Sequence, residues 1–234
     1  MKERCILVTG SSSGIGRAIT GRFLDAGATV IGIARDHEKF CPNTDKYKAY
    51  KIDVADLNAL ADGLKEILSA YPHLNGFVSN AGYGIFDGLE NFSVEQISTY
   101  ITANLSSHIV AVRTLLPNFK SKKGGDILFI GSEAALKGGK KGSLYCAAKF
   151  GLRGFAQTIR EECSGKGIRV SLINPGMVRT EFFKNLEFGP GDDPSNAIEP
   201  DDVAIAAMNI FATRAETVID EINLTPLKKV IKFD

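Results

Sequence analysis

The chain of 234 residues contains no tryptophan, only three methionines and only four cysteines. The cysteines, Cys5, Cys41, Cys146 and Cys163, show no C-x-x-C spacing and no accompanying histidine cluster, which argues against a zinc site and against a disulfide framework. Free thiols are typical of a reducing compartment, so we expect a cytoplasmic protein without a metal site. Cys146 is interpreted as a helix-packing residue and not as a nucleophile.

Long hydrophobic runs and a charge excess are also absent. No stretch of about 18 apolar residues occurs, which argues against a membrane span. The first ten residues, MKERCILVTG, lack the apolar region and the small-residue cleavage site of a signal peptide. Twenty-eight basic and 27 acidic residues leave a formal charge of +1. This balance gives no electrostatic footprint for nucleic acid or an anionic membrane, so we expect neither as a partner.

Short apolar segments alternate with helical patterns along the whole chain. Seven segments are predicted to be strands, at residues 4–9, 27–34, 47–52, 74–79, 125–131, 168–173 and 217–224. Helices are predicted at about 14–26, 56–70, 93–119, 143–165 and 201–212. Apolar strands that alternate with helices predict an α/β fold, a doubly wound parallel sheet of about seven strands flanked by helices. Without a linker or repeat, residues 1–234 are expected to form a single Rossmann-type domain.

The first predicted strand runs into TGSSSGIG at residues 9–16, with glycines at positions 10, 14 and 16. A strand, a glycine turn and a helix that begins near Gly14 are the parts of a dinucleotide phosphate site. Backbone N–H groups and the helix dipole there can hold a pyrophosphate. The spacing G-x-x-x-G-x-G differs from the usual G-x-G-x-x-G fingerprint. A plain loop of small residues is therefore the alternative interpretation.

The end of the second strand indicates which dinucleotide is preferred. In such folds an acidic residue at this position binds the ribose 2′-hydroxyl, whereas an arginine accommodates a 2′-phosphate. Here Arg35 follows Ala34, so NADP(H) is favoured. Asp36 keeps NAD(H) open, because its carboxylate could bind the ribose if Arg35 points to solvent.

Tyr145 and Lys149 lie four residues apart in the segment SLYCAAKFGLRGF, on one face of a predicted helix. An adjacent ammonium favours the phenolate and is expected to lower the tyrosine pKa from about 10 toward neutrality. Such a tyrosine suits general acid/base catalysis. Ser132 ends the strand at 125–131 and would face the same site, because parallel sheets bind ligands at their carboxyl ends. Taken alone, the pair also fits a solvated lysine beside a half-buried tyrosine.

In this order and spacing, the motifs resemble those of the short-chain dehydrogenase/reductase family over nearly the whole chain. TGSSSGIG matches its cofactor turn, SNAG at 79–82 its NNAG element, and NPGMVRT at 174–180 its nicotinamide-carboxamide segment. The resemblance implies a catalytic tetrad of Asn104, Ser132, Tyr145 and Lys149. The cofactor-binding residues expected from the resemblance and the motifs are Gly10, Ser12, Ser13, Gly14, Ile15, Gly16, Arg35, Asp53, Val54, Asn80, Ala81, Gly82, Tyr145, Lys149, Pro175, Gly176, Val178 and Thr180.

The resemblance also implies a mechanism. Ser132 would hold the substrate oxygen and Tyr145 would exchange its proton, while a hydride passes between the substrate carbon and the nicotinamide. Lys149 would lower the tyrosine pKa and bind the nicotinamide ribose, and Asn104 would support a relay water. We therefore expect NADP(H)-dependent interconversion of an alcohol and a carbonyl, on a small hydroxy acid or another small carbonyl compound. The alternative is a catalytically silent NAD(P)-binding regulatory or scaffold protein.

Residues 177–200 are polar and bear glycine and proline, yet they contain Phe182, Phe183 and Phe188. We predict a substrate-binding lid with an apolar inner face; an ordinary surface excursion is the alternative. Lys137, Lys140 and Lys141 precede Tyr145, and they would either attract an acidic substrate or be solvated surface lysines.

Three further expectations concern the surroundings of the site. The segment between the second and third strands is shorter than is common in the family, so the adenosine end is expected to be more open. Pairing of the helices at 93–119 and 143–165, as in the family, implies a homodimer or homotetramer. The tail TPLKKVIKFD is expected to be loose or to dock on a partner.

Overall fold

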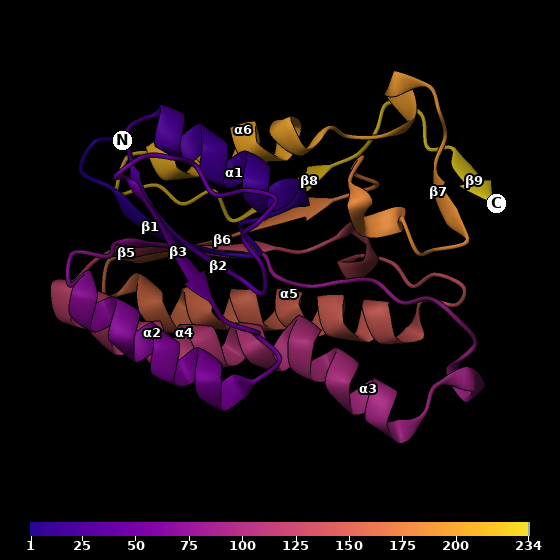
Figure 1. Cartoon of the computed structure of the whole chain (residues 1–234), viewed down its shortest axis with the longest axis horizontal. Coiled ribbons are helices and arrows are strands. Elements are labelled where there is room, and N and C mark those ends of the chain that lie inside the picture. The colour runs from indigo at the N-terminus through magenta and orange to yellow at the C-terminus, as the bar shows by residue number, and fades with distance from the viewer. Residues whose placement is uncertain (234) are drawn as a thin grey trace.

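The computed structural model describes residues 1–233 and consists of a sheet between two layers of helices (Figure 1). Within these residues, seven parallel strands pair in the order β3-β2-β1-β4-β5-β6-β8. They are β1 (Cys5–Thr9), β2 (Thr29–Ala34), β3 (Tyr47–Lys51), β4 (Gly76–Ser79), β5 (Gly125–Ile130), β6 (Ile168–Pro175) and β8 (Glu221–Leu224). The predicted doubly wound α/β fold with about seven parallel strands is confirmed.

The strand order reverses at β1, which pairs with β2 on one side and with β4 on the other. From β1 the chain adds β2 and β3 on one side of the sheet, and then β4, β5, β6 and β8 on the other side. In an open parallel sheet, ligands bind outside the carboxyl ends of the strands at such a reversal. The glycine turn after β1 and the turn after β4 meet at this point.

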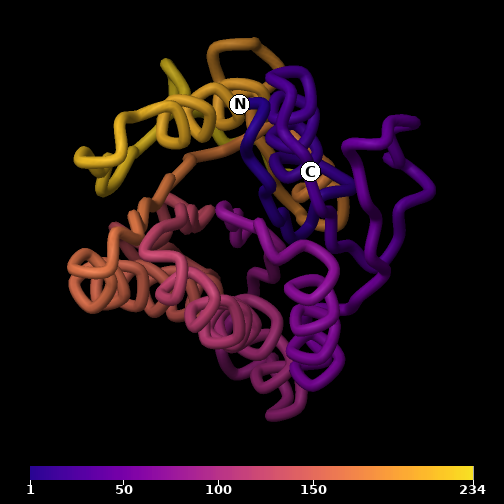
Figure 2. Tube along the Cα trace, turned by 90° about the vertical axis from the view of Figure 1, so that its left-hand side faces the viewer, coloured from indigo at the N-terminus to yellow at the C-terminus, as the bar shows by residue number. Residues whose placement is uncertain are grey.

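Helices α1 (Gly14–Asp25) and α6 (Pro200–Ala212) cover one face of the sheet. Helices α2 (Leu57–Ala70), α4 (Ser107–Lys122) and α5 (Ser143–Ser164) cover the other face (Figure 1). Figure 2 shows that the indigo and golden helical segments, α1 and α6, share one layer although they are far apart in sequence. The apolar stripes of these helices pack on the strands and form two cores, one on each face of the sheet.

The long helix predicted over residues 93–119 is interrupted. Helix α3 (Val94–Ile101) leads into a π-helical turn, η2 (Thr102–Ser106), and α4 follows it. Ser93 begins α3 with a capping box: its Oγ accepts from the Gln96 N–H at 3.1 Å, and Gln96 Oε1 accepts from the Ser93 N–H at 2.8 Å. Asn104 lies inside the π turn, and such turns are frequent at functional sites.

The segment after β6 folds over the carboxyl ends of the strands. It contains the 3₁₀ turns η4 (Glu181–Phe183) and η5 (Pro194–Asn196) and the short strand β7 (Phe188–Pro190). Two further 3₁₀ turns, η1 (Leu89–Asn91) and η3 (Glu133–Ala135), lie on the loops after β4 and β5. Figure 1 shows β7 standing at one end of the molecule, beside the C-terminal segment.

The C-terminal tail was expected to be loose or to dock on a partner; for residues 225–233 the loose alternative is wrong, and docking on a partner stays a prediction. Its strand β9 (Ile231–Phe233) pairs antiparallel with β7, with Phe188 opposite Phe233. The Gly191 N–H donates to the Val230 carbonyl at 3.1 Å, and Lys229 pairs with Glu133 at 2.7 Å. The tail satisfies backbone groups of residues 188–191 that would otherwise depend on water.

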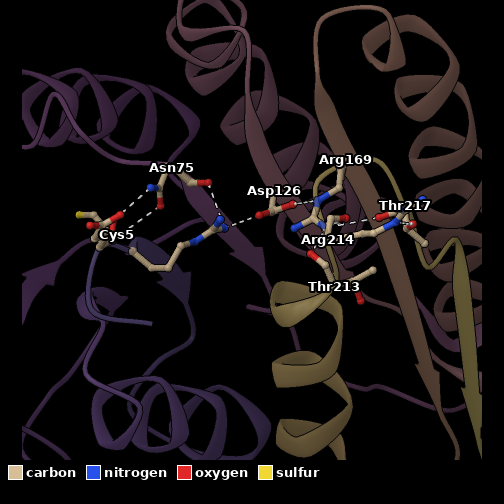
Figure 3. Close-up of polar contacts among 9 residues, drawn as sticks. Cys5, Asn75, Asp126, Arg169, Thr213, Arg214 and Thr217 are labelled. Carbon is tan, nitrogen blue, oxygen red and sulfur yellow. Dashed lines mark hydrogen bonds and ion pairs between the residues drawn. The ribbon is translucent and has the colours of Figure 1, made fainter.

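Asp126 anchors the opposite, amino-terminal edge of the sheet (Figure 3). It is 4% exposed, pairs with Arg4, and accepts a hydrogen bond from Arg169 Nε at 2.5 Å. Arg169 Nη1 also donates to the carbonyls of Thr213 and Arg214, at 2.6 and 3.0 Å. These contacts join β1, β5 and β6 to the end of α6, far from the carboxyl ends where the candidate site lies.

Across residues 1–233 we find no helix that combines the length and the apolar character needed to cross a bilayer. The same residues contain no group of three or more His, Cys, Asp or Glu side chains that could hold a metal ion.

Candidate active site

The turn after β1 needs its glycines. Gly10 and Gly14 have positive φ values of 69° and 51°, in the left-handed region that side chains rarely adopt. A Cβ on Gly16 would lie 2.1 Å from the Gly10 carbonyl oxygen. Asn80 holds the turn from the β4 side, because its Nδ2 donates to the Thr9 carbonyl at 2.9 Å. The first turn of α1 has no side-chain cap, so its N–H groups can donate hydrogen bonds to an anion.

A pocket of about 340 Å³ adjoins this turn. Its wall is formed by Ser12, Ser13, Gly14, Arg17, Ala18, Lys39, Arg179, Thr180, Glu181 and Pro200. Three of these side chains are cations. Lys39 Nζ lies 3.2 Å from Glu181 across the mouth, and Arg179 Nε lies 3.3 Å from Glu199. The excess of cations around an open helix amino end suits a polyanion such as a dinucleotide with several phosphates.

The basic residues that line this pocket differ from the one predicted. Arg35 is exposed at the end of β2 and is not part of the wall. Arg17 and Lys39 are part of it, and sequence reasoning missed both. The guanidinium of Arg17 lies 5.0 Å from the centroid of the Phe40 ring. The position of Arg17 in the first turn of the helix after the glycine turn was the sequence signal that could have identified it.

The loop of residues 35–46 is short, as expected, and is tied down by side chains. The Tyr47 hydroxyl lies 3.2 Å from Ser11 Oγ and 3.1 Å from His37 Nδ1. The rings of Phe40 and Tyr47 pack edge to face at 6.0 Å. Ser11 belongs to the glycine turn and is fully buried. These contacts therefore link the turn to the loop that carries Lys39.

The remaining predicted cofactor residues lie along the carboxyl edge of the sheet. Asp53 is exposed, and its Oδ1 accepts from the Ala55 N–H at 3.0 Å. The Gly176 N–H donates to the Leu224 carbonyl at 2.8 Å, which fixes the end of β6. Thr180 lies beside the glycine turn, because a Cβ on Gly14 would be 3.4 Å from its Cγ2. Val54, Ala81, Gly82, Pro175 and Val178 occupy the strand ends and loops between these points.

Ser132, Tyr145 and Lys149 come together where β5 ends and α5 begins. Ser132 follows Gly131, the residue after β5. Its Oγ accepts from the Ala134 N–H at 3.2 Å, and it lies near enough to Tyr145 to lower the pKa of the phenol. Lys149 Nζ lies 5.9 Å from the centroid of the Tyr145 ring, on the same face of α5. It is only 6% exposed and donates to the Ile130 carbonyl at 3.1 Å.

Burial is the main cause of the pKa shifts of Tyr145 and Lys149. It raises the pKa of Tyr145 to about 12, and the hydrogen bond with Ser132 only partly opposes the rise. Burial also lowers the pKa of Lys149 to about 8. The expectation that Lys149 lowers the Tyr145 pKa is therefore wrong for this structure. The physical reason is that the ammonium bonds to the Ile130 carbonyl and not to the phenol, which packs among apolar rings.

Asn104 joins the π turn to the loop after β4. It is 1% exposed; its Nδ2 donates to the Tyr100 carbonyl at 3.1 Å and its Oδ1 accepts from the Tyr83 N–H at 3.0 Å. A Cβ on Gly82 would lie 2.7 Å from this Oδ1. Both polar atoms of the Asn104 side chain therefore form hydrogen bonds, which join the SNAG loop to the helical segment of α3 and η2.

His108, one turn after Asn104, is a buried polar residue that sequence reasoning missed. Its Nδ1 lies 2.6 Å from Ser79 Oγ, and its Nε2 has no hydrogen-bond partner among the described residues. Burial, and secondarily the charge of Lys149, lower the pKa of His108 to about 3. The imidazole is therefore neutral at physiological pH.

Aromatic rings surround the Tyr145 phenol. Phe86, from the loop after β4, lies 5.1 Å from Tyr145 between ring centroids, and Phe182 lies 5.9 Å from it. Lys137, Lys140 and Lys141 are exposed on the loop before α5. Phe182 was predicted to face the site, whereas Phe86 was not recognised.

Comparison with known proteins gives consistent results. Residues 4–189 match the family described as short chain dehydrogenase. The chain is 30% identical to an NADP-dependent 3-hydroxy acid dehydrogenase of Schizosaccharomyces pombe, with 92% of this chain and 89% of the relative covered. It is 29% identical to a sepiapterin reductase of Chlorobaculum tepidum, over 99% of this chain and 100% of the relative.

Among solved structures, the chain is similar to the closed form of a serine dehydrogenase complexed with NADP⁺. The two superpose with a TM-score of 0.84 and 28% identity, over 94% of each chain.

Proposed function

Because the chain belongs to the short-chain dehydrogenase family and is an oxidoreductase of that family, we propose that it interconverts an alcohol and a carbonyl with NADP(H). The observation that carries this proposal is the convergence of Ser132, Tyr145 and Lys149 at the end of β5, on the same carboxyl edge of the sheet as the glycine turn after β1. A dinucleotide site and an acid/base group thus lie at the same edge of the sheet. Hydride transfer to or from a nicotinamide requires both.

The residues around the pocket fit the cofactor. The backbone of residues 12–14 and the uncapped end of α1 would hold the pyrophosphate. Arg17 and Lys39, with Arg35 nearby on the exposed loop, supply the positive charge that a 2′-phosphate needs. The names of the relative and the solved neighbour, which specify NADP, support NADP(H) over NAD(H). When bound, this cofactor supplies or accepts the hydride.

Tyr145 is proposed as the proton donor in carbonyl reduction. With a pKa of about 12 the phenol is protonated at neutral pH, so it can donate as negative charge develops on the substrate oxygen. The Ser132 hydroxyl, which lies close to the phenol, would donate a second hydrogen bond to that oxygen. Lys149, held against the Ile130 carbonyl at 3.1 Å, would bind the nicotinamide ribose. Asn104 would hold the loop and helix that frame this group.

A small hydroxy acid is the substrate class suggested by the C-terminal sequence, and the name of the S. pombe relative supports it. We keep it as one candidate within small carbonyl compounds. A catalytically silent NAD(P)-binding scaffold remains the competing function, and the intact Ser132, Tyr145 and Lys149 set argues against it.

The decisive experiment is the Tyr145→Phe variant, assayed with a panel of carbonyl compounds and both NADPH and NADH. Loss of the proton donor is expected to lower kcat at least about 100-fold. The Kd of NADPH, measured by its fluorescence, should change little, and Tyr71→Phe on the far end of α2 serves as the matched control. Persistent activity in Tyr145→Phe would refute the acid/base assignment. A wild-type protein that binds NADPH but reduces no carbonyl would favour the scaffold, and a preference for NADH would refute the cofactor assignment.

We also propose that residues 177–200 act as the substrate lid within a single domain, and that the protein is a cytoplasmic homodimer or homotetramer. The packing of α4 beside α5 on one face of the sheet supports pairing of the kind the family uses. A monomeric mass by light scattering would contradict the oligomer.

A further inference from the structure

Five aromatic rings form a closed circuit that includes the catalytic phenol. We call Phe86, Tyr145, Phe182, Phe183 and Phe188 the aromatic circuit. Its successive centroid distances are 5.1 Å for Phe86–Tyr145, 5.9 Å for Tyr145–Phe182, 5.1 Å for Phe182–Phe183, 6.0 Å for Phe183–Phe188 and 5.0 Å for Phe188–Phe86. All five rings are partly exposed, so they present apolar surface at the site and are not sealed within a core.

The circuit is assembled from separate parts of the chain. Phe86 comes from the loop after β4, Tyr145 from α5, and the other three rings from the predicted lid. Most of the pairs meet edge to face, which is the favoured geometry for aromatic rings. Gly84 makes the packing possible, because a Cβ there would lie 2.3 Å from Phe182 Cζ and 2.9 Å from Phe86 Cε2.

Charges around the circuit do not favour an acidic substrate. Lys229 is already paired with Glu133, next to Ser132, at 2.7 Å, so it is not available to bind a substrate carboxylate. Lys149 is turned to the Ile130 carbonyl. A substrate carboxylate placed among the rings would lose its hydration without either of these two cations to replace it, which is costly. Lys137, Lys140 and Lys141 are exposed to solvent on the loop before α5. A ring would instead exchange water contact for edge-to-face contacts.

From this arrangement we infer that the substrate is an apolar carbonyl compound with an aromatic ring close to its carbonyl group. The ring packs into the aromatic circuit, while the oxygen reaches Ser132 and Tyr145. This inference rests on the proposed function and adds the substrate class to it. It favours the uncharged members of the small carbonyl compounds over hydroxy acids.

The test compares two methyl ketones that differ only in one group, phenylacetone and acetoacetate. Each is reduced with NADPH, and phenyl in the first replaces carboxylate in the second. We expect kcat/KM for phenylacetone to be at least about tenfold higher, since burial and edge-to-face packing of one ring are together worth that factor or more. Equal or better use of acetoacetate would overturn the inference and support the hydroxy acid class.

Substitutions in the aromatic circuit test whether its rings cause the preference for phenylacetone. Phe182→Leu and Phe86→Leu should lower kcat/KM for phenylacetone about fivefold or more and leave the Kd of NADPH unchanged. The control Phe150→Leu, at an exposed ring on α5 outside the circuit, should have no effect. Equal losses for phenylacetone and acetoacetate would overturn the assignment, because the rings would then matter only for general structure.

A binding measurement separates this inference from the proposed function. Saturation-transfer NMR should show that the phenyl protons of phenylacetone contact the wild-type protein and lose that contact in Phe182→Leu. If the ring binds but no ketone is reduced, the proposed function fails and the aromatic site stands. If ketones are reduced without a preference for the phenyl group, the function stands and the aromatic site fails.

Discussion

At the scale of single residues, burial decides which form of each titratable group the site contains. Tyr145, Lys149 and His108 all have pKa values displaced toward their neutral forms, and burial is the largest cause in each case. For Tyr145 and His108, neighbouring charges add to the effect of burial, and hydrogen bonds oppose it without reversing it. The site is therefore an apolar environment into which a few polar atoms project.

His108 provides a prediction about acid stability. Its pKa is lowered from about 6.5 to about 3, so the folded state binds its proton less readily than the unfolded chain. Its stabilising contribution is therefore complete above pH 6.5 and is lost as the pH falls toward 3. Between pH 6.5 and 5 we expect a loss of about 2 kcal/mol in the free energy of unfolding from this residue.

Urea unfolding at several pH values between 7.5 and 5 measures this loss. The His108→Asn variant keeps a donor toward Ser79 and should show a shallower decline of stability with acid. His73→Asn, at an exposed position, is the control and should decline like the wild type. Identical slopes in His108→Asn and the wild type would contradict the buried-histidine explanation.

The sequence identified Ser132, Tyr145 and Lys149 as one group because helical spacing and strand ends determine which residues can meet. It could not give the proton affinities, since these depend on how deeply Tyr145 is covered by Phe86 and Phe182. Those rings come from distant segments, and their approach depends on Gly84. Periodicity within a single segment contains no information about such contacts.

At the scale of secondary-structure elements, the pairing of β9 with β7 has the clearest functional consequence. Deleting residues 228–234 removes β9 and the Lys229–Glu133 ion pair beside Ser132. The proposed lid at residues 177–200 would then close less often, so we expect KM for the carbonyl substrate to rise roughly fivefold to tenfold. The Kd of NADPH should change little, because the pocket at the glycine turn has no wall from the tail.

Steady-state kinetics measure the expected rise in KM, and NADPH fluorescence titration measures whether the Kd of NADPH stays the same. A milder pair of variants, Lys229→Gln and Lys228→Gln, tests the ion pair alone. Only the first should raise KM, since Glu133 contacts Lys229. An unchanged KM after deletion would show that the lid closes without the tail.

The positions of helices and strands were largely predictable, and the exceptions have identifiable causes. The break between α3 and α4 escaped prediction because residues 93–119 keep a helical pattern through the π turn at Thr102–Ser106. The β7–β9 pair escaped because both strands have only three residues and little alternation. Arg17 and Lys39 were missed because their joint position depends on the anchored loop between β2 and β3.

At the scale of the whole molecule, Asp126 fixes the edge of the sheet opposite the site (Figure 3). The Asp126→Asn variant would leave Arg4 and Arg169 with no carboxylate at a largely buried position. We expect a loss of about 3–5 kcal/mol in the free energy of unfolding. KM should stay unchanged, because the network lies at the amino-terminal edge.

Urea unfolding measures the stability loss. The control is Asp62→Asn, which removes the exposed Lys65 pair on α2 and should cost about 0–1 kcal/mol. A similar cost for both variants would show that burial does not strengthen the Asp126 contacts.

The alternation of strands and helices was enough to predict the topology of the sheet. The Asp126 network was not predicted, because its Arg4–Asp126 contact joins residues over 100 positions apart and leaves no pattern in the sequence.

The antiparallel contact between β7 and β9 also governs how the protein can be handled. An affinity tag or fluorescent fusion appended after β9 would start beside β7 at the proposed substrate entrance, whereas the N-terminus lies at the other end of the molecule (Figure 1). Purification handles and immobilisation linkers therefore belong ahead of Met1. A reporter dye attached near β9 would instead sense opening of the entrance.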